Sequence, residues 1–188
     1  MKPYNGYKAE RRSVRVPLPA GGYVAKILGA KEISYDWGSV LQLSFDIAEG
    51  EHKDFWAKDY KSNPAEDKKW RGVIRLNVPK DDGTEKDEWT KRGFNDAMAC
   101  VEESNAGYTW AWDEKTLAGK LIGVIYRDRE WEMNGRSGWT TEAGKLTTVG
   151  DIRGGTFKQL DPKPLEKKSN GFTAPAAWSP ANDSDLPF

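Results

Sequence analysis

From Leu41 to Ile47 apolar and polar side chains alternate strictly, and this pattern restricts the fold of the chain more than any other feature. A period of two indicates a half-buried strand, because successive side chains of a strand point to opposite faces. Segments rich in β-forming residues and bounded by turn signals precede and follow it. The sequence therefore predicts a mostly β domain. The side chains expected on the buried face of this strand are Leu41, Leu43, Phe45 and Ile47.

The same reasoning predicts further strands and a single helix. Asn134-Gly135 is a strong signal for a tight hairpin turn between two of the strands. Residues 90–103 show helical spacing, with an apolar face made by Phe94, Ala97, Met98 and Val101. The predicted strands are 23–35, 40–47, 55–60, 73–78, 117–131 and 139–149, with a final short strand near Phe157.

This order of elements favours an OB-fold-like architecture, a small five-stranded Greek-key barrel with one helix. The helix would follow the fourth strand segment, unless residues 73–78 continue the third strand after an insertion. Residues 1–19 form a basic N-terminal arm and residues 20–161 the β-domain. After Asp161 the chain becomes rich in Pro, Ala, Ser and Asn, so residues 162–188 are predicted to be a disordered linker and tip.

Composition narrows the functional classes. The chain has one cysteine and one histidine, so it has no intramolecular disulfide and no Cys/His metal cluster, and no cofactor is expected. No apolar stretch approaches the length of a membrane span, and no signal peptide is expected. These features favour a reducing cytoplasm, that of the host if a phage encodes the chain. Nine tryptophans are hard to bury in one small core, which indicates that some lie on a ligand-binding surface.

The C-terminus is the most specific motif in the sequence. Its acidic and apolar residues resemble the tail tip of bacterial and phage single-stranded-DNA-binding proteins, although such tips usually carry more acids. The resemblance implies that the tip recruits replication or recombination proteins. A terminal phenylalanine offers a ring and a free carboxylate to an apolar pocket with a basic rim. The matching residues are Asp183, Asp185, Leu186, Pro187 and Phe188.

A looser similarity extends to the β-domain. The chain resembles small phage OB-fold proteins encoded near recombination genes. The segments that carry this similarity are Gly21-Gly22-Tyr23, residues 41–47, and Leu117-Ala118-Gly119-Lys120. It implies a non-catalytic protein that coats single-stranded DNA during replication, recombination or repair.

Aromatic and basic residues interleave on two predicted strands, as expected for stacking on bases and contact with phosphates. On the predicted strand 55–60, alternation places Trp56, Lys58 and Tyr60 on one face. The late hairpin offers a second group in which Arg127, Arg129 and Trp131 recur at period two. The other residues predicted to contact the nucleic acid are Trp37 in the first turn, Arg75 on strand 73–78, and Arg136 and Trp139 across the late turn.

Other interpretations stay open. Each aromatic group also fits an amphipathic strand whose tryptophan covers a barrel end, and Trp110 and Trp112 share a face beside the helix end. Exposed tryptophans also suit a carbohydrate-binding or structural β-module, and a recombination annealing or RNA-binding protein is a further alternative. The sequence contains neither a nucleophile elbow nor a phosphate-binding loop, so no enzyme activity is expected. A homo-oligomer is compatible with these features.

Overall fold

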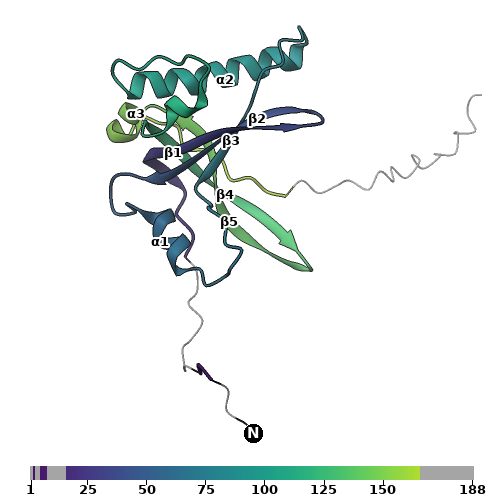
Figure 1. Cartoon of the computed structure of the whole chain (residues 1–188), viewed down its shortest axis with the longest axis vertical. Coiled ribbons are helices and arrows are strands. Elements are labelled where there is room, and N and C mark those ends of the chain that lie inside the picture. Colours follow the sequence, from purple (N-terminus) through teal and green to yellow (C-terminus); the bar gives the residue numbers. More distant parts are fainter. Residues whose placement is uncertain (1, 3–4, 8–15, 166–188) are drawn as a thin grey trace, which may run out of the picture.

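Five antiparallel strands form one open sheet, and three α-helices and a 3₁₀ turn pack around it. The computed structural model describes residue 2, residues 5–7 and residues 16–165 (Figure 1). The prediction of a mostly β domain is confirmed. In chain order the elements are β1 (Gly21–Tyr35), β2 (Gly38–Ile47), α1 (Phe55–Ser62), β3 (Val73–Asn77), α2 (Glu85–Ser104), η1 (Glu114–Leu117), β4 (Leu121–Met133), β5 (Arg136–Thr147) and α3 (Val149–Gly154).

The strand order in the sheet is β3-β2-β1-β4-β5, with β1 in the middle and β3 and β5 at the two edges. Every neighbouring pair is antiparallel. No backbone hydrogen bond joins β3 to β5, both of which the structure describes in full. The sheet therefore curves without closing into a hydrogen-bonded barrel. Helix α2 follows β3, so residues 73–77 act as the third strand of the sheet.

The core lies on the face of the sheet covered by α2. The alternating apolar side chains of β2, from Leu41 to Ile47, are all buried, as the sequence predicts, and Phe45 is fully enclosed. The apolar face of α2 is likewise buried, which confirms its predicted orientation. Thr84 caps the helix by accepting a hydrogen bond from the backbone N–H of Asp87. Both sets of side chains belong to one core cluster, in which α2 packs mainly against β3, β4 and β5.

Two long hairpins project from this core and spread apart on the same side of the molecule (Figure 1). One is β1–β2 and the other is β4–β5, which turns at Asn134-Gly135. Both turn residues have positive φ, 52° and 71°, as the predicted tight turn requires. The hairpin prediction is confirmed.

The prediction of a strand over residues 55–60 is wrong, because Phe55–Ser62 forms helix α1. Asp54 precedes the helix in a left-handed conformation and makes no side-chain cap. The cap comes from Asp46 on β2 instead. Its buried carboxylate accepts hydrogen bonds from the backbone N–H groups of Trp56 and Ala57, at 2.9 and 3.0 Å. A cap so distant in sequence leaves no local signal.

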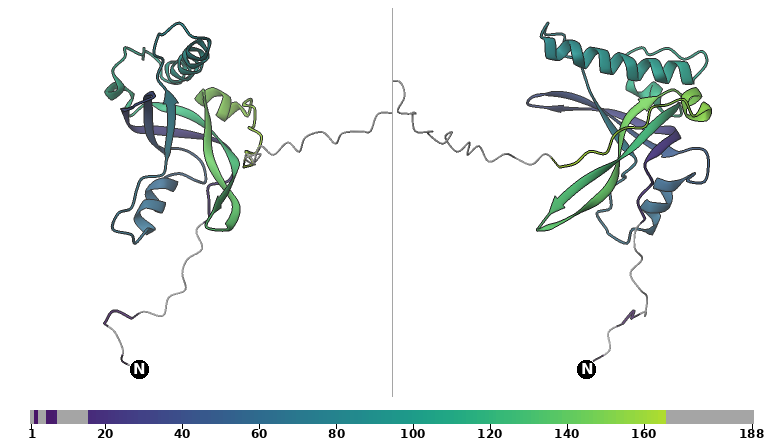
Figure 2. Two further views of the ribbon diagram at one scale, coloured as in Figure 1. Left: turned by 90° about the vertical axis from the view of Figure 1, so that its right-hand side faces the viewer. Right: turned by 180° about the vertical axis from the view of Figure 1, so that it is seen from behind.

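The predicted short strand near Phe157 is also wrong. Helix α3 precedes this residue, and the chain then runs along β4, as the two views in Figure 2 show. Lys163 forms a single parallel bridge with Arg129, with its N–H donating to the carbonyl oxygen of Asp128. The packed region therefore extends beyond residue 161. At the other end, fully buried Leu18 shows that it also begins before residue 20.

Candidate nucleic-acid interface

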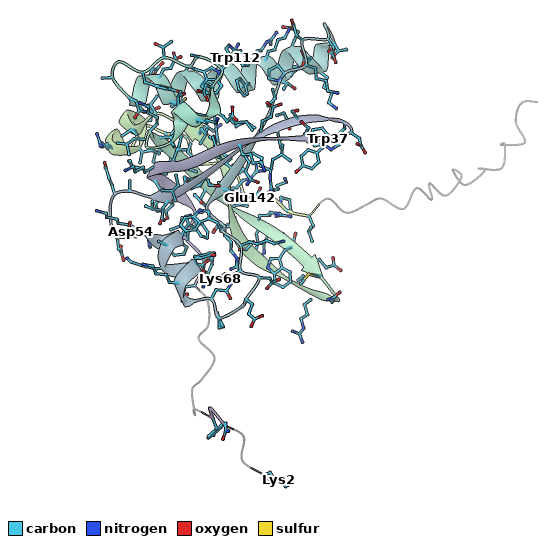
Figure 3. All side chains as sticks on the ribbon, in the orientation of Figure 1. Lys2, Trp37, Asp54, Lys68, Trp112 and Glu142 are labelled. Carbon is cyan, nitrogen blue, oxygen red and sulfur yellow. The ribbon has the colours of Figure 1, made fainter. Side chains whose placement is uncertain are left out.

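The tip of the β1–β2 hairpin carries a pair of stacked aromatic rings. Trp37 is 58% exposed and Tyr35 is 44% exposed. Their ring centroids lie 5.3 Å apart with an angle of 6° between the planes. Figure 3 shows Trp37 at the far end of this hairpin. Because the pair supports itself outside the core, one face of the stack is available to a flat ligand.

Basic residues lie beside this aromatic pair. A hollow of about 130 Å³ separates the hairpin tip from the start of α2, and Trp37, Lys80 and Lys86 all line it. Asp82 and Asp87 line it too, so the charge there is mixed. An ammonium group beside an exposed ring suits a phosphate next to a stacked base.

The tip of the β4–β5 hairpin exposes a second set of apolar side chains. Trp139 is 53% exposed and Met133 is 66% exposed. Strand alternation places Trp139 on the same face of β5 as Thr141 and Ala143, whereas Trp131 lies on the opposite face, against Gly138. The predicted residues of this hairpin therefore divide between its two faces. Arg136, opposite Met133 in the ladder, is exposed at the tip.

Arg127 and Arg129 lie on one face of β4, as predicted, but both contact an acid there. The Nη2 of Arg127 lies 3.0 Å from Oε1 of Glu142, and the Nε of Arg129 lies 3.5 Å from Oε2. Lys163 approaches the same carboxylate at 3.9 Å. Three basic side chains thus share one acid, which leaves positive charge for an anionic ligand.

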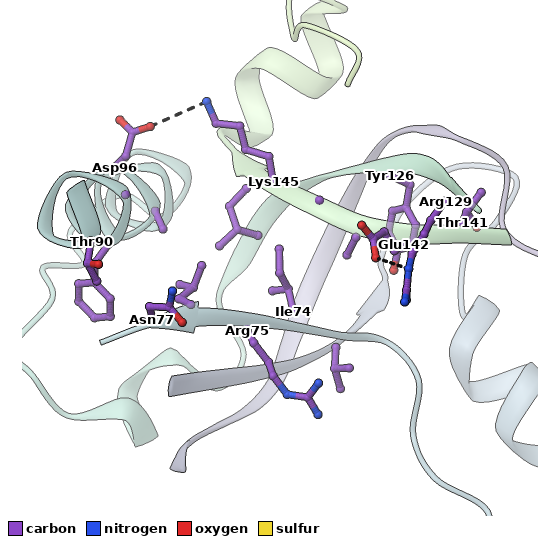
Figure 4. Close-up of a pocket in the computed structure, with 18 of the residues that line it drawn as sticks. Ile74, Arg75, Asn77, Thr90, Asp96, Tyr126, Arg129, Thr141, Glu142 and Lys145 are labelled. Atoms are coloured by element: carbon purple, nitrogen blue, oxygen red, sulfur yellow. Dashed lines mark ion pairs between the residues drawn. The ribbon is translucent and has the colours of Figure 1, made fainter. Parts of the chain in front are cut away.

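A cleft of about 790 Å³ lies between the edge strands β3 and β5, beside α2 (Figure 4). Its floor includes Trp56 and Tyr126, whose rings stack with centroids 6.3 Å apart. Burial raises the pKa of Tyr126 above its ordinary value, so its phenol stays neutral. Basic residues outnumber acids along the walls: Arg71, Arg75, Lys86, Arg129 and Lys145 against Asp96 and Glu142.

Arg75 lies on the solvent side of β3. It is exposed and its Nε donates a hydrogen bond to Oε1 of Gln42 on β2, at 3.0 Å. Alternation along β3 turns Arg75 to the opposite face from Ile74 and Leu76. The edge strand β3 and this hydrogen bond to β2 therefore hold Arg75 in place while its side chain stays exposed to solvent.

The first predicted aromatic group does not form a binding face. Trp56 is only 6% exposed and belongs to the core, so it has no face for a base. Lys58 is exposed, but its Nζ donates to the backbone carbonyl of Lys53. The half-buried Tyr60 packs against Trp70 and lies under Lys68. These residues separate because α1 is a helix, whereas their grouping assumed a strand.

Sequence reasoning missed several exposed aromatic residues. Tyr35 is one, although its position two residues before Trp37 in a turn was a usable signal. Trp89 is 64% exposed at the edge of the cleft, with Arg92 over its ring. Trp112, which the sequence analysis did name together with Trp110, is 68% exposed and stacks on Phe94, away from both hairpin tips. The predicted tip residues 183–188 lie outside the described residues.

The described residues contain no group of three His, Cys, Asp or Glu side chains placed to hold a metal ion. Among the same residues, no helix is long and apolar enough to cross a lipid bilayer. The sequence matches no protein-family model and no curated protein.

Proposed function

We propose that this chain binds single-stranded DNA between its two projecting hairpins and recruits other proteins through its C-terminal tip. The observation that carries the proposal is the exposed aromatic residue on each hairpin, Trp37 on one and Trp139 on the other. Single-strand binders hold nucleotides by stacking bases on such rings and tracking phosphates with basic side chains. The basic side chains along the cleft between β3 and β5 would supply the phosphate contacts.

The arrangement of strands supports this proposal. The order β3-β2-β1-β4-β5, with a helix between β3 and β4, is one that a partly open five-stranded Greek-key barrel could adopt. OB-folds bind oligonucleotides on the face of their second and third strands and on the loops after strands one and four. Those loops correspond here to the turns that carry Trp37 and Asn134. We therefore propose that the sheet is an OB-fold whose last closing pair is unformed.

The recruitment function rests on the sequence of the tip. Asp183, Asp185 and the Leu186-Pro187-Phe188 ending resemble the protein-docking tips described above. A tether between the β-domain and the tip would hold a captured partner at high effective concentration near the DNA. The DNA-binding and protein-binding functions would then belong to separate parts of the chain.

A fluorescence titration with oligothymidylate at two salt concentrations tests DNA binding. We expect tryptophan emission to fall on binding, because stacking places a base against an exposed indole. Affinity should decrease steeply as salt rises, through release of counterions from the DNA. A carbohydrate-binding module would show saturable quenching by oligosaccharides with little dependence on salt, and no response to oligothymidylate. That result would exclude the proposed function.

A further inference from the structure

The hollow beside Trp37 and the cleft between β3 and β5 adjoin each other along helix α2. Three residues line both spaces, namely Asn77 at the end of β3 and Lys86 and Thr90 on α2. Figure 4 shows Thr90 and Asn77 on the same side of the cleft. A DNA strand with one base on Trp37 would therefore find a continuous surface that runs from the hairpin tip along α2.

Trp89 lies on this surface, one helical turn after Lys86. It is 64% exposed and it lines the cleft, so part of its ring faces that space. The guanidinium group of Arg92 lies over the ring, 5.3 Å from its centroid, and supports the indole from one side. An indole this exposed gains little from burial in the fold, whereas its position suits stacking on a base.

Gly93, one turn further along α2, leaves the next part of this face without a side chain. It lies inside a helix of 20 residues, where glycine is less favourable than any residue except proline. Apart from the residues that adjoin it in the helix, nothing lies within 4 Å of the position of a Cβ, so packing does not require a glycine here. A bare helix backbone permits close approach of a ligand. Gly93 therefore favours a ligand that passes over α2 beside Trp89.

The charges on this face favour an anionic ligand. Lys91 pairs with three acids around the start of α2, which are Asp81, Asp87 and Glu88. Lys86 and Arg92, in contrast, form no ion pair with any of the described residues. Their positive charge is therefore available to the phosphate groups of a strand that lies along the helix.

We propose that this face of α2 is a third base-stacking subsite for single-stranded DNA. One base lies against the indole of Trp89, its sugar passes over Gly93, and Lys86 contacts the phosphate that leads from the base on Trp37. The inference rests on the proposed function and adds a helix to a surface otherwise made by two hairpins. All of these residues are exposed, so the nucleotide stays on the rim of the cleft and does not enter where β3 and β5 approach each other.

Trp89→Ala removes the proposed stacking surface from the full chain. We expect the affinity for a labelled oligothymidylate, measured by fluorescence anisotropy, to fall roughly 5- to 150-fold, which corresponds to one stacked base. Anisotropy of the label reports affinity without depending on how many tryptophans the variant retains.

Lys86→Gln removes one proposed phosphate contact. The slope of log affinity against log salt concentration should become shallower by about 0.7, the change expected for one contact on a single strand. Lys115→Gln is the matched control, because Lys115 is exposed and lines neither space. It should leave the slope unchanged, and equal changes in both variants would contradict a contact at Lys86.

Gly93→Gln tests the close approach independently of the ring. Glutamine is a better helix former than glycine, so the melting temperature should rise while oligothymidylate affinity falls by about tenfold or more. Asn95→Gln places the same side chain at an exposed position of α2 that lines neither space, and it should keep the natural affinity.

The outcomes distinguish the subsite from the proposed function. Natural affinity in both Trp89→Ala and Gly93→Gln, together with weakened binding in Trp37→Ala, would overturn the subsite and leave DNA binding by the hairpins standing. Equal losses in Gly93→Gln and Asn95→Gln would assign the effect to the helix as a whole and would also overturn it. A natural chain that does not bind oligothymidylate would overturn the proposed function itself.

Discussion

At the scale of single residues, two carboxylates organise the ends of helices. Asp46 is buried on β2 and accepts three backbone hydrogen bonds, two of them from the first turn of α1. Asp151 lies in the first turn of α3 and accepts hydrogen bonds from the hydroxyl groups of Thr147 and Thr148. Both acids satisfy donors near a helix N-terminus, where negative charge is favourable.

Replacing Asp46 should destabilise the domain without touching the proposed DNA surface. Asp46→Ala leaves the backbone N–H groups of Trp56 and Ala57 without their acceptor, at an expected cost of about 2–3 kcal/mol in unfolding free energy. Urea denaturation followed by circular dichroism measures this loss. Asp46→Asn keeps one acceptor oxygen and should cost less. Oligothymidylate affinity of the folded variants should stay unchanged, and a large loss would instead connect α1 to the binding surface.

The hydrogen bonds to Asp151 predict that the stability of the folded domain depends on pH in the acidic range. Hydrogen bonds from Thr147, Thr148 and Thr156 hold the pKa of Asp151 below its ordinary value of 3.8. A carboxyl group whose pKa is lower in the folded state stabilises the fold above its unfolded pKa. That contribution is lost as the pH falls through the folded pKa. Thermal melts between about pH 6 and pH 3 should show a smaller acid-induced decrease for Asp151→Asn than for the natural chain. Identical decreases would contradict this role.

At the scale of elements, the two hairpins give the molecule its proposed binding surface. Each strand pair extends past the core, so its tip residues pack against one another and not against the interior. The parallel rings of Tyr35 and Trp37 illustrate this, since they lie 5.3 Å apart while both remain exposed. The hairpin β4–β5 presents Trp139 on the face of β5 that also lines the cleft.

Removing the aromatic ring at one hairpin tip should weaken DNA binding by the free energy of stacking one base on that ring. For Trp37→Ala and for Trp139→Ala we expect a loss of about 1–3 kcal/mol, or roughly 5- to 150-fold in the dissociation constant for oligothymidylate. Trp112→Ala is the matched control, because Trp112 is also exposed but lies away from both tips. Equal losses in all three variants would show that the effect is not specific to the hairpins.

At the scale of the whole molecule, the chain divides into a packed β-domain and a C-terminal region with a different composition. Its acidic and basic residues balance overall, 29 against 29, but their positions differ along the chain. The cleft is predominantly basic, whereas the last ten residues carry Asp183 and Asp185 and no basic side chain. This separation is what the proposed division between DNA binding and protein recruitment requires.

Deleting residues 179–188 should separate the two proposed functions. The truncated chain loses the acids and the terminal Phe188, so partner binding should disappear. Oligothymidylate affinity should stay the same or rise, because the deletion removes negative charge that repels DNA. Pull-down with purified replication proteins and the fluorescence titration measure these effects. A truncated chain that no longer bound DNA would contradict the division.

The sequence predicts most of the fold, but only part of the candidate site. The alternation along β2 and the helical spacing along α2 were sufficient to predict these two elements and their buried residues, because each pattern arises from one face that packs against the core. Residues 55–60 were predicted as a strand but form a helix. A segment this short fits a strand period of two and a helical period of 3.6 equally well, and the residue that caps the helix, Asp46, lies on another element of the chain. The grouping of Trp56, Lys58 and Tyr60 failed with it. Whether a tryptophan is buried depends on what packs over it, which sequence spacing does not determine.

Photo-crosslinking tests most directly whether the hairpin tips hold the bases. Irradiating the full chain with an oligothymidylate that contains bromouracil, followed by mass spectrometry, identifies the side chains that touch the bases. We predict crosslinks at Trp37 or Tyr35 on one hairpin and at Trp139 on the other, all suppressed by high salt. Crosslinks confined to α1 or to Trp112, with both tips unmodified, would contradict the proposed binding surface.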